Sequence, residues 1–117
     1  MRSVQAAISP EALERLLAYR RRLENLLPGM VTRVLLFGSR ARGDADPDSD
    51  FDVAVFLAKP AAQRTDVRAK VFDAAFEQMA GGFALEARSL PEDYLDPVEG
   101  HFRTELARRI AEEGVAV

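Results

Sequence analysis

Hydrophobic and polar positions follow a helical rhythm in the first quarter of the chain. Between residues 10 and 27, leucines recur at spacings of three and four, which predicts an amphipathic helix. Residues 9–11 (Ser-Pro-Glu) have the order of a helix cap, a proline at the first helical position and an acidic first turn. Pro28-Gly29 would end this helix. Its leucines are Leu13, Leu16, Leu17, Leu23, Leu26 and Leu27.

The pattern then changes to short apolar runs separated by small polar residues. One run covers residues 34–37 and stops at Gly38-Ser39, and a second begins at Phe51 and continues to residue 56. The segment between them contains glycine, proline and aspartate, which favour turns and loops. The pattern predicts a strand, a tight turn, a loop and a second strand.

Two carboxylates, Asp50 and Asp52, alternate with apolar residues at the start of the second run. In a strand, residues two apart point to the same face, so Asp50 and Asp52 would project together while Phe51 and Val53 enter the core. Their Cα atoms would lie roughly 6.5–7 Å apart, close enough for both carboxylates to share a divalent metal or a metal pair. Hard oxygen ligands suit Mg²⁺ or Mn²⁺, and no nearby His or Cys points to zinc.

The turn after the first run has the features of a phosphate site. Gly38 lets the backbone turn sharply and lets a phosphate approach without a Cβ in the way. Ser39 offers a hydroxyl and can cap a helical turn whose free N–H groups attract anions, and Arg40 and Arg42 add positive charge. Carboxylates for metal beside donors for phosphate indicate metal-assisted phosphoryl or nucleotidyl transfer.

A second amphipathic helix is expected between about residue 65 and Gly81-Gly82. Its large apolar residues are expected to belong to the core and not to a cofactor pocket. Residues 83–90 then read as a third strand. The members of the helical stripe are Val67, Val71, Phe72, Ala75, Phe76 and Met79.

A last helix is predicted to start after Asp96, because Asp96-Pro97 and Glu99 have the spacing of a capping box with proline at the first helical position. Val98, Phe102, Leu106 and Ile110 form its apolar series, and Gly114 ends it. His101 lies one step off that series and is interpreted as a surface residue. The apolar tail 115–117 is expected to fray, to add an edge strand or to join an interface.

Length and composition narrow the class of protein. The 117 residues predict one domain, 1–117, with 48% hydrophobic and 30% charged residues, as in ordinary soluble proteins. The net charge of −3 disfavours a direct nucleic-acid binder. No apolar run approaches membrane-spanning length and no cysteine is present, so no membrane association and a cytoplasmic location are expected. The architecture predicted is α/β: a small mixed β-sheet with helices packed on one face.

Residues 36–43 (LFGSRARG) and 49–52 (SDFD) resemble the signature of the minimal nucleotidyltransferases in the DNA polymerase β-like superfamily. The motif is Gly38-Ser39, ten intervening residues and Asp50-Phe51-Asp52, and it covers about a sixth of the chain. The predicted order of elements also fits the polymerase β-like core. Either half of the motif alone would be a weak signal. Both halves at this spacing, each at an apolar strand, make a specific one.

The resemblance implies a third carboxylate on a later strand beside the paired acids. Glu86 is the one acid in the third predicted strand, although the residue expected there is more often aspartate. The alternative is that Glu86 and Arg88 form a surface ion pair of little energetic value. On the first interpretation, two Mg²⁺ ions would be held by Asp50, Asp52 and Glu86, with ATP as the substrate.

The resemblance also implies a partner, because many small members are antitoxins paired with HEPN-type ribonuclease toxins. A core of this size has little room for an acceptor cleft, so transfer of AMP from ATP to a hydroxyl of the toxin, a tyrosine above all, is the favoured function. Two alternatives stay open. One is a non-catalytic antitoxin that acts by binding. The other is a small-molecule nucleotidyltransferase whose acceptor site lies across a homodimer.

Overall fold

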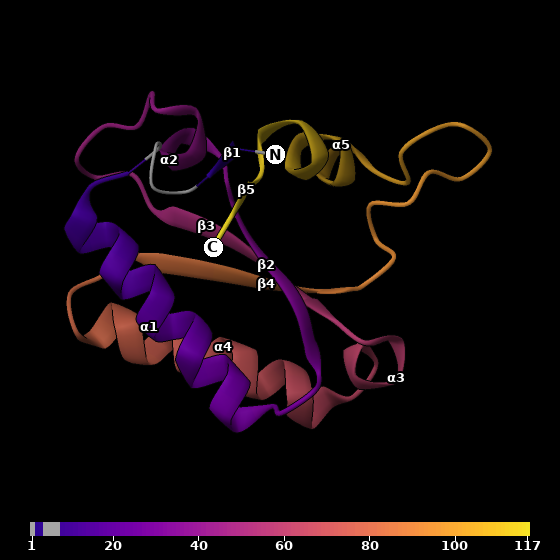
Figure 1. Cartoon of the computed structure of the whole chain (residues 1–117), viewed down its shortest axis with the longest axis horizontal. Coiled ribbons are helices and arrows are strands. Elements are labelled where there is room, and N and C mark those ends of the chain that lie inside the picture. The colour runs from indigo at the N-terminus through magenta and orange to yellow at the C-terminus, as the bar shows by residue number, and fades with distance from the viewer. Residues whose placement is uncertain (1, 4–7) are drawn as a thin grey trace.

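The structure, a computed structural model, describes residues 2–3 and 8–117 and contains a five-stranded mixed sheet in the order β1-β5-β2-β3-β4 (Figure 1). Strands β2 and β3 are antiparallel neighbours, and α4 carries the chain to β4, which is parallel to β3. The predicted α/β class is confirmed. The elements are β1 (Arg2–Ser3), α1 (Pro10–Leu26), β2 (Val31–Phe37), α2 (Ser39–Arg42), β3 (Phe51–Leu57), α3 (Lys59–Ala62), α4 (Thr65–Ala80), β4 (Leu85–Pro91), α5 (Glu105–Glu113) and β5 (Val115–Ala116).

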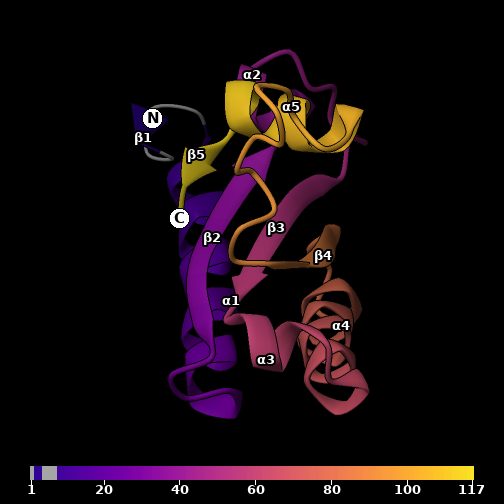
Figure 2. The same cartoon turned by 90° about the vertical axis from the view of Figure 1, so that its right-hand side faces the viewer.

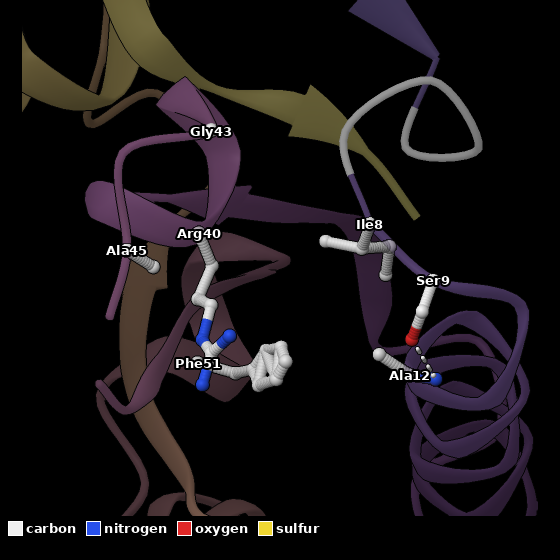
Figure 3. A pocket seen from close by; sticks show the side chains of 7 residues that line it. All are labelled: Ile8, Ser9, Ala12, Arg40, Gly43, Ala45 and Phe51. Carbon is white, nitrogen blue, oxygen red and sulfur yellow. Dashed lines mark hydrogen bonds between the residues drawn. The ribbon is translucent and has the colours of Figure 1, made fainter. Parts of the chain in front are cut away.

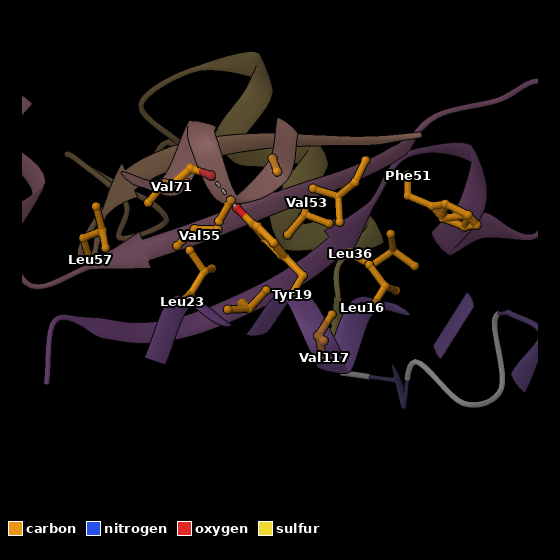
Figure 4. Packing of buried hydrophobic residues seen from close by; sticks show 14 of the residues in the cluster. Leu16, Tyr19, Leu23, Leu36, Phe51, Val53, Val55, Leu57, Val71 and Val117 are labelled. Atoms are coloured by element: carbon orange, nitrogen blue, oxygen red, sulfur yellow. Dashed lines mark hydrogen bonds between the residues drawn. The ribbon is translucent and has the colours of Figure 1, made fainter. Parts of the chain in front are cut away.

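Helices α1 and α4 cover one face of the sheet and form the larger core with it (Figure 4). The predicted cap of α1 is confirmed, since the Ser9 side chain accepts a hydrogen bond from the Ala12 N–H. Tyr19 is fully buried between the two helices, and its hydroxyl donates to the Val71 carbonyl at 3.0 Å. This bond gives the buried hydroxyl a partner and ties α1 to α4.

Helix α5 lies against the other face of the sheet, where Ile110 packs with Leu35, Phe37 and Phe56. This differs from the predicted arrangement, in which helices pack on one face alone. Nearly every position of β2 after Arg33 and of β3 is apolar, so both faces of these strands have apolar side chains and need a cover. Figures 1 and 2 place α5 and α2 at one end of the molecule and α3 at the other.

The expectation that the whole apolar stripe of α4 is core is wrong. Val67, Val71 and Ala75 are buried, but Phe72, Phe76 and Met79 are 65%, 60% and 50% exposed. Helix α4 packs over β4, which has no neighbouring strand on its outer side among the described residues. The flank of α4 that points past this edge therefore has no described element against it.

The last helix, α5, begins eight residues later than the capping-box spacing predicts, at Glu105 instead of Pro97. Thr104 is its N-cap and its hydroxyl oxygen accepts from the Ala107 N–H at 3.0 Å. Residues Glu99 and Gly100 have positive φ angles of 52° and 82°, which do not fit a right-handed helix. Val98 and Phe102 are consequently exposed instead of packed. His101 is exposed, as expected.

The C-terminal tail is an inner strand of the sheet. Strand β5 pairs with β2 on one side and with β1 on the other, and Val115 and Val117 are buried. Among the three outcomes expected for this tail, strand formation is confirmed, although the strand is not at the edge. Within the described residues, none of the helices combines the length and the apolar character needed to span a membrane.

Candidate active site

The turn between β2 and α2 depends on Gly38. Its backbone has φ 79° and ψ −161°, a conformation found almost only at glycine. A Cβ atom at this position would lie 2.6 Å from the Asp52 Oδ2 atom, closer than two non-bonded atoms approach. The carboxylate of Asp52 therefore lies directly against the turn, and only a residue without a side chain leaves room for it.

Two adjacent strands, β3 and β4, bring the acidic residues together beside the end of β2. Asp52 is paired in register with Phe37 of β2 on one side and with Glu86 of β4 on the other. Residues paired in this way have side chains on the same face, so Asp52 and Glu86 are neighbours there. Asp50 comes directly before β3 and is exposed, as is Glu86.

The surroundings of Asp52 oppose its ionisation. Partial burial raises the pKa of the Asp52 carboxyl group, and the negative charges of Glu86 and Asp50 raise it further. Arg109 and Arg88 act in the opposite direction. Like charges gathered at one point of a surface favour a cation between them, which is a property expected of a metal site.

The three carboxylates are suitable ligands for a hard divalent cation, although in this conformation they do not surround a single point. All three acids offer carboxylate oxygens, the ligands that Mg²⁺ and Mn²⁺ prefer. Within the described part of the chain, no three Asp, Glu, His or Cys side chains are close enough to hold a metal ion as they stand. Because Asp50 and Glu86 are exposed, their side chains are free to change rotamer toward Asp52.

Ser39 and Arg40 have different surroundings, although they are adjacent in the sequence. The Ser39 hydroxyl makes no hydrogen bond with any residue that the structure describes, so it is available to a ligand. Arg40 donates to the carbonyl oxygens of Ser49 and Pro47 and lies over the ring of Phe51, 4.4 Å from its centroid (Figure 3). This arrangement favours a structural role for Arg40, which fastens the loop before β3.

A hollow of about 200 Å³ lies between Arg40, Phe51 and the start of α1. Figure 3 shows the side chains around it. Phe51 and Asp52 are consecutive residues of β3 and therefore point to opposite faces of the sheet. This hollow is accordingly separate from the acidic residues. It is lined by Ile8, Ser9, Ala12, Arg40, Gly43, Ala45 and Phe51.

Glu113 is part of the site and was not among the residues expected from the sequence. Its Oε1 atom accepts from the Gly38 N–H at 3.1 Å and from Arg42 Nη1 at 2.9 Å. Arg42 also pairs with Asp44 at 3.1 Å. A carboxylate therefore already occupies the N–H and the guanidinium that were expected to face phosphate. Only the fold brings the end of α5 to this turn, so no local pattern marks Glu113.

Three comparisons with known proteins agree with this geometry. The Nucleotidyltransferase domain family matches residues 14–117. A protein of Methanocaldococcus jannaschii provisionally named protein adenylyltransferase MJ0141 is 38% identical over 47 residues, which are 40% of this chain and 48% of that protein. The aligned segment thus spans about half the length of this curated relative.

Two crystal structures share the fold at 19% sequence identity. A provisionally assigned nucleotidyltransferase from Sulfolobus solfataricus superposes with a TM-score of 0.57 over 93% of this chain and 87% of its own. A toxin–antitoxin structure with AMP-PNP superposes with a TM-score of 0.55 over 85% and 69%. Because the family match covers nearly the whole chain, including the glycine turn and the acidic strand, the protein belongs to the Nucleotidyltransferase domain family.

Proposed function

We propose that this protein is a Mg²⁺-dependent nucleotidyltransferase of the minimal type, which transfers AMP from ATP to a hydroxyl of a cognate HEPN-type toxin and so acts as its antitoxin. One observation carries the proposal. The carboxylate of Asp52 lies against the Gly38 turn on one side and beside Glu86 on the other. Acids and a phosphate-binding turn in direct contact are what nucleotidyl transfer requires.

Asp50, Asp52 and Glu86 would hold the metal. A bound Mg²⁺ supplies neutralising charge for the triphosphate and for the oxygen that attacks the α-phosphorus. The pKa of Asp52 is raised first by its partial burial and then by the two neighbouring carboxylates, and a bound cation would offset both effects. Ser39, whose hydroxyl is unpaired among the described residues, would donate to the terminal phosphates.

The nature of the acceptor is supported by the comparisons and by the resemblance. The curated relative is provisionally named a protein adenylyltransferase, and one structural neighbour is a toxin–antitoxin with AMP-PNP. A HEPN-type toxin and a tyrosine acceptor come from the resemblance of residues 36–52 to the minimal nucleotidyltransferases. A protein acceptor can supply the contacts that this small core lacks.

The test is a transfer assay with α-labelled ATP, Mg²⁺, the chain and the product of the neighbouring gene. We expect label on the partner protein, and mass spectrometry of the labelled peptide should find AMP on a tyrosine. Asp52→Asn should abolish labelling. Asp73→Asn is the matched control, because Asp73 is an exposed aspartate of α4 on the opposite side of the sheet.

Two other results would replace the proposal. A stable complex that inhibits the toxin without label on either protein would identify an antitoxin that acts by binding alone. Label on an added small molecule and none on the partner would identify a small-molecule nucleotidyltransferase. Equal labelling by wild-type and Asp52→Asn protein would remove the acids from the mechanism.

A further inference from the structure

The outer edge of β4 and the exposed flank of α4 form one surface. A groove of about 390 Å³ lies between them. Large apolar side chains of α4 line one side of this groove, and the outer edge of β4 lines the other side. Monomeric proteins seldom leave three large apolar side chains together in solvent, so such a surface indicates an interaction site. The groove is lined by Phe72, Ala75, Phe76, Met79, Leu85, Glu86 and Ala87.

The backbone of β4 is available for pairing along this edge. Ala84 O accepts from Phe51 N and Glu92 N donates to Leu57 O, so the even-numbered residues of this strand bond to β3. The N–H and C=O groups of Ala87 and Ser89 therefore point outward. No described residue hydrogen-bonds with them. A strand edge of this kind is a template for another strand.

The charged residues of β4 indicate which strand can pair with its outer edge. Glu86 and Arg88 are both exposed, flank Ala87 on the open face and form no ion pair within the described part of the chain. If a second β4 pairs antiparallel about a two-fold axis at Ala87, Glu86 lies opposite Arg88 of the other copy, and Arg88 lies opposite its Glu86. Charged residues on a strand edge usually prevent pairing with another strand. In this register, however, each charge faces the opposite charge of the second copy.

The same two-fold axis would also bury the exposed apolar side chains of α4. An axis perpendicular to the sheet keeps both α4 helices on one side of the joined sheet, with their exposed flanks facing each other. Phe72, Phe76 and Met79 of the two copies would then cover one another. Ala87 would form a hydrogen-bonded pair with its counterpart, since its free N–H and C=O point outward.

We propose that the β4 edge and the exposed flank of α4 form a homodimer interface, in which two β4 strands pair antiparallel about Ala87. This inference does not depend on the transferase function. The dimer joins two sheets into one and directs both acidic faces to the same side. Arg88 of the second copy then lies beside Glu86 of the candidate site.

The first test is the mass of the purified chain by light scattering and sedimentation. We expect about twice 12.9 kDa at micromolar concentration. Arg88→Glu places two like-charge pairs in the interface and should raise the dimer dissociation constant about tenfold or more. The double variant Glu86→Arg/Arg88→Glu restores both pairs and should restore the dimer. Arg21→Glu, an equal charge change at an exposed position of α1, should leave the dimer intact.

The second test examines the register by cross-linking. The chain has no cysteine, so single cysteines can be introduced without background. Ala87→Cys would lie opposite itself and should give a covalent dimer on mild oxidation. Ser89→Cys, on the same side of the strand, would lie opposite Leu85 and should not. Circular dichroism confirms that each variant is folded. A monomeric wild type, a dimer insensitive to Arg88→Glu, or cross-linking at position 89 instead of 87 would each overturn the proposal.

Discussion

The strand–turn–strand unit of residues 31–57 and the helix–strand unit of residues 65–91 use similar apolar residues with different results. In the first unit, every large apolar side chain from Val34 to Leu57 is buried, because α1 covers one face of the strands and α5 covers the other. In the second, half of the apolar stripe of α4 is in solvent. The spacing of apolar residues shows which side of an element is apolar. The neighbouring elements decide whether that side is covered.

The two units also differ in how well their backbones accommodate substitutions. Gly38 has no room for a single added carbon atom, since Asp52 lies against it. The outer edge of β4 has N–H and C=O groups that pair with no residue the structure describes, and a groove lies beside it. Substitutions should therefore have large effects at the Gly38 turn, and small effects on folding along the outer edge of β4 and the exposed flank of α4.

The largest effect is expected from Asp52→Asn on nucleotidyl transfer. The substitution keeps the shape of the side chain and removes the charge that would hold a cation, so the rate should fall by roughly 10³-fold or more. Single-turnover labelling at saturating Mg²⁺ measures this rate. A loss of less than tenfold would mean that the acid beside the glycine turn is not part of the reaction.

Gly38→Ala should strongly destabilise the protein although it adds a single carbon atom. It forces alanine into a glycine-only conformation and drives a Cβ into the Asp52 carboxylate, with an expected cost of about 2–4 kcal/mol. Gly43→Ala is the control, because Gly43 also has a positive φ (86°) but nothing within 4 Å of an added Cβ. It should cost about 1 kcal/mol. Urea unfolding measures both, and equal costs would show that the contact with Asp52 is unimportant.

Neighbouring residues on α4 allow the comparison to be tested within one helix. Val71→Ala removes two buried methyl groups and should destabilise the protein by about 2 kcal/mol. Phe72→Ala removes a larger side chain that is 65% exposed, and the change should stay within about 0.5 kcal/mol. The measurement is urea unfolding at low protein concentration. A larger loss for Phe72→Ala than for Val71→Ala would show that the exposed flank is packed in solution.

The smallest effect is a gain of stability in Asp52→Asn that depends on pH. The folded-state pKa of Asp52 is raised above its unfolded value, so its stabilising contribution is greatest at low pH and is lost as the pH rises through the folded pKa. Asparagine does not titrate. The melting temperature of Asp52→Asn should thus exceed that of the wild type by about 1–3 °C at pH 7, since solvent screens the partly exposed group. The difference should shrink toward pH 3.

Much of the fold and part of the site could be predicted from the sequence because the signals are local. The Ser9 cap, the strand that ends at Gly38 and the strand that carries Asp52 are each defined by a few adjacent residues. The start of α5 was missed because residues 96–99 match a capping box, while Glu99 and Gly100 take positive φ angles. Glu113 and the exposure of Phe72 depend on contacts between distant segments, for which a single sequence has no pattern.

On the proposed function, the hydrogen bond between Glu113 and Gly38 would compete with phosphate at the Gly38 turn. One N–H cannot serve two acceptors fully, so a phosphate oxygen that uses it must displace the Glu113 carboxylate. Glu113 is followed by Gly114 and then by β5, which lies between β1 and β2. A ligand at the turn would therefore act on the helix that leads directly into β5, the strand that pairs with β1 near the start of the described chain.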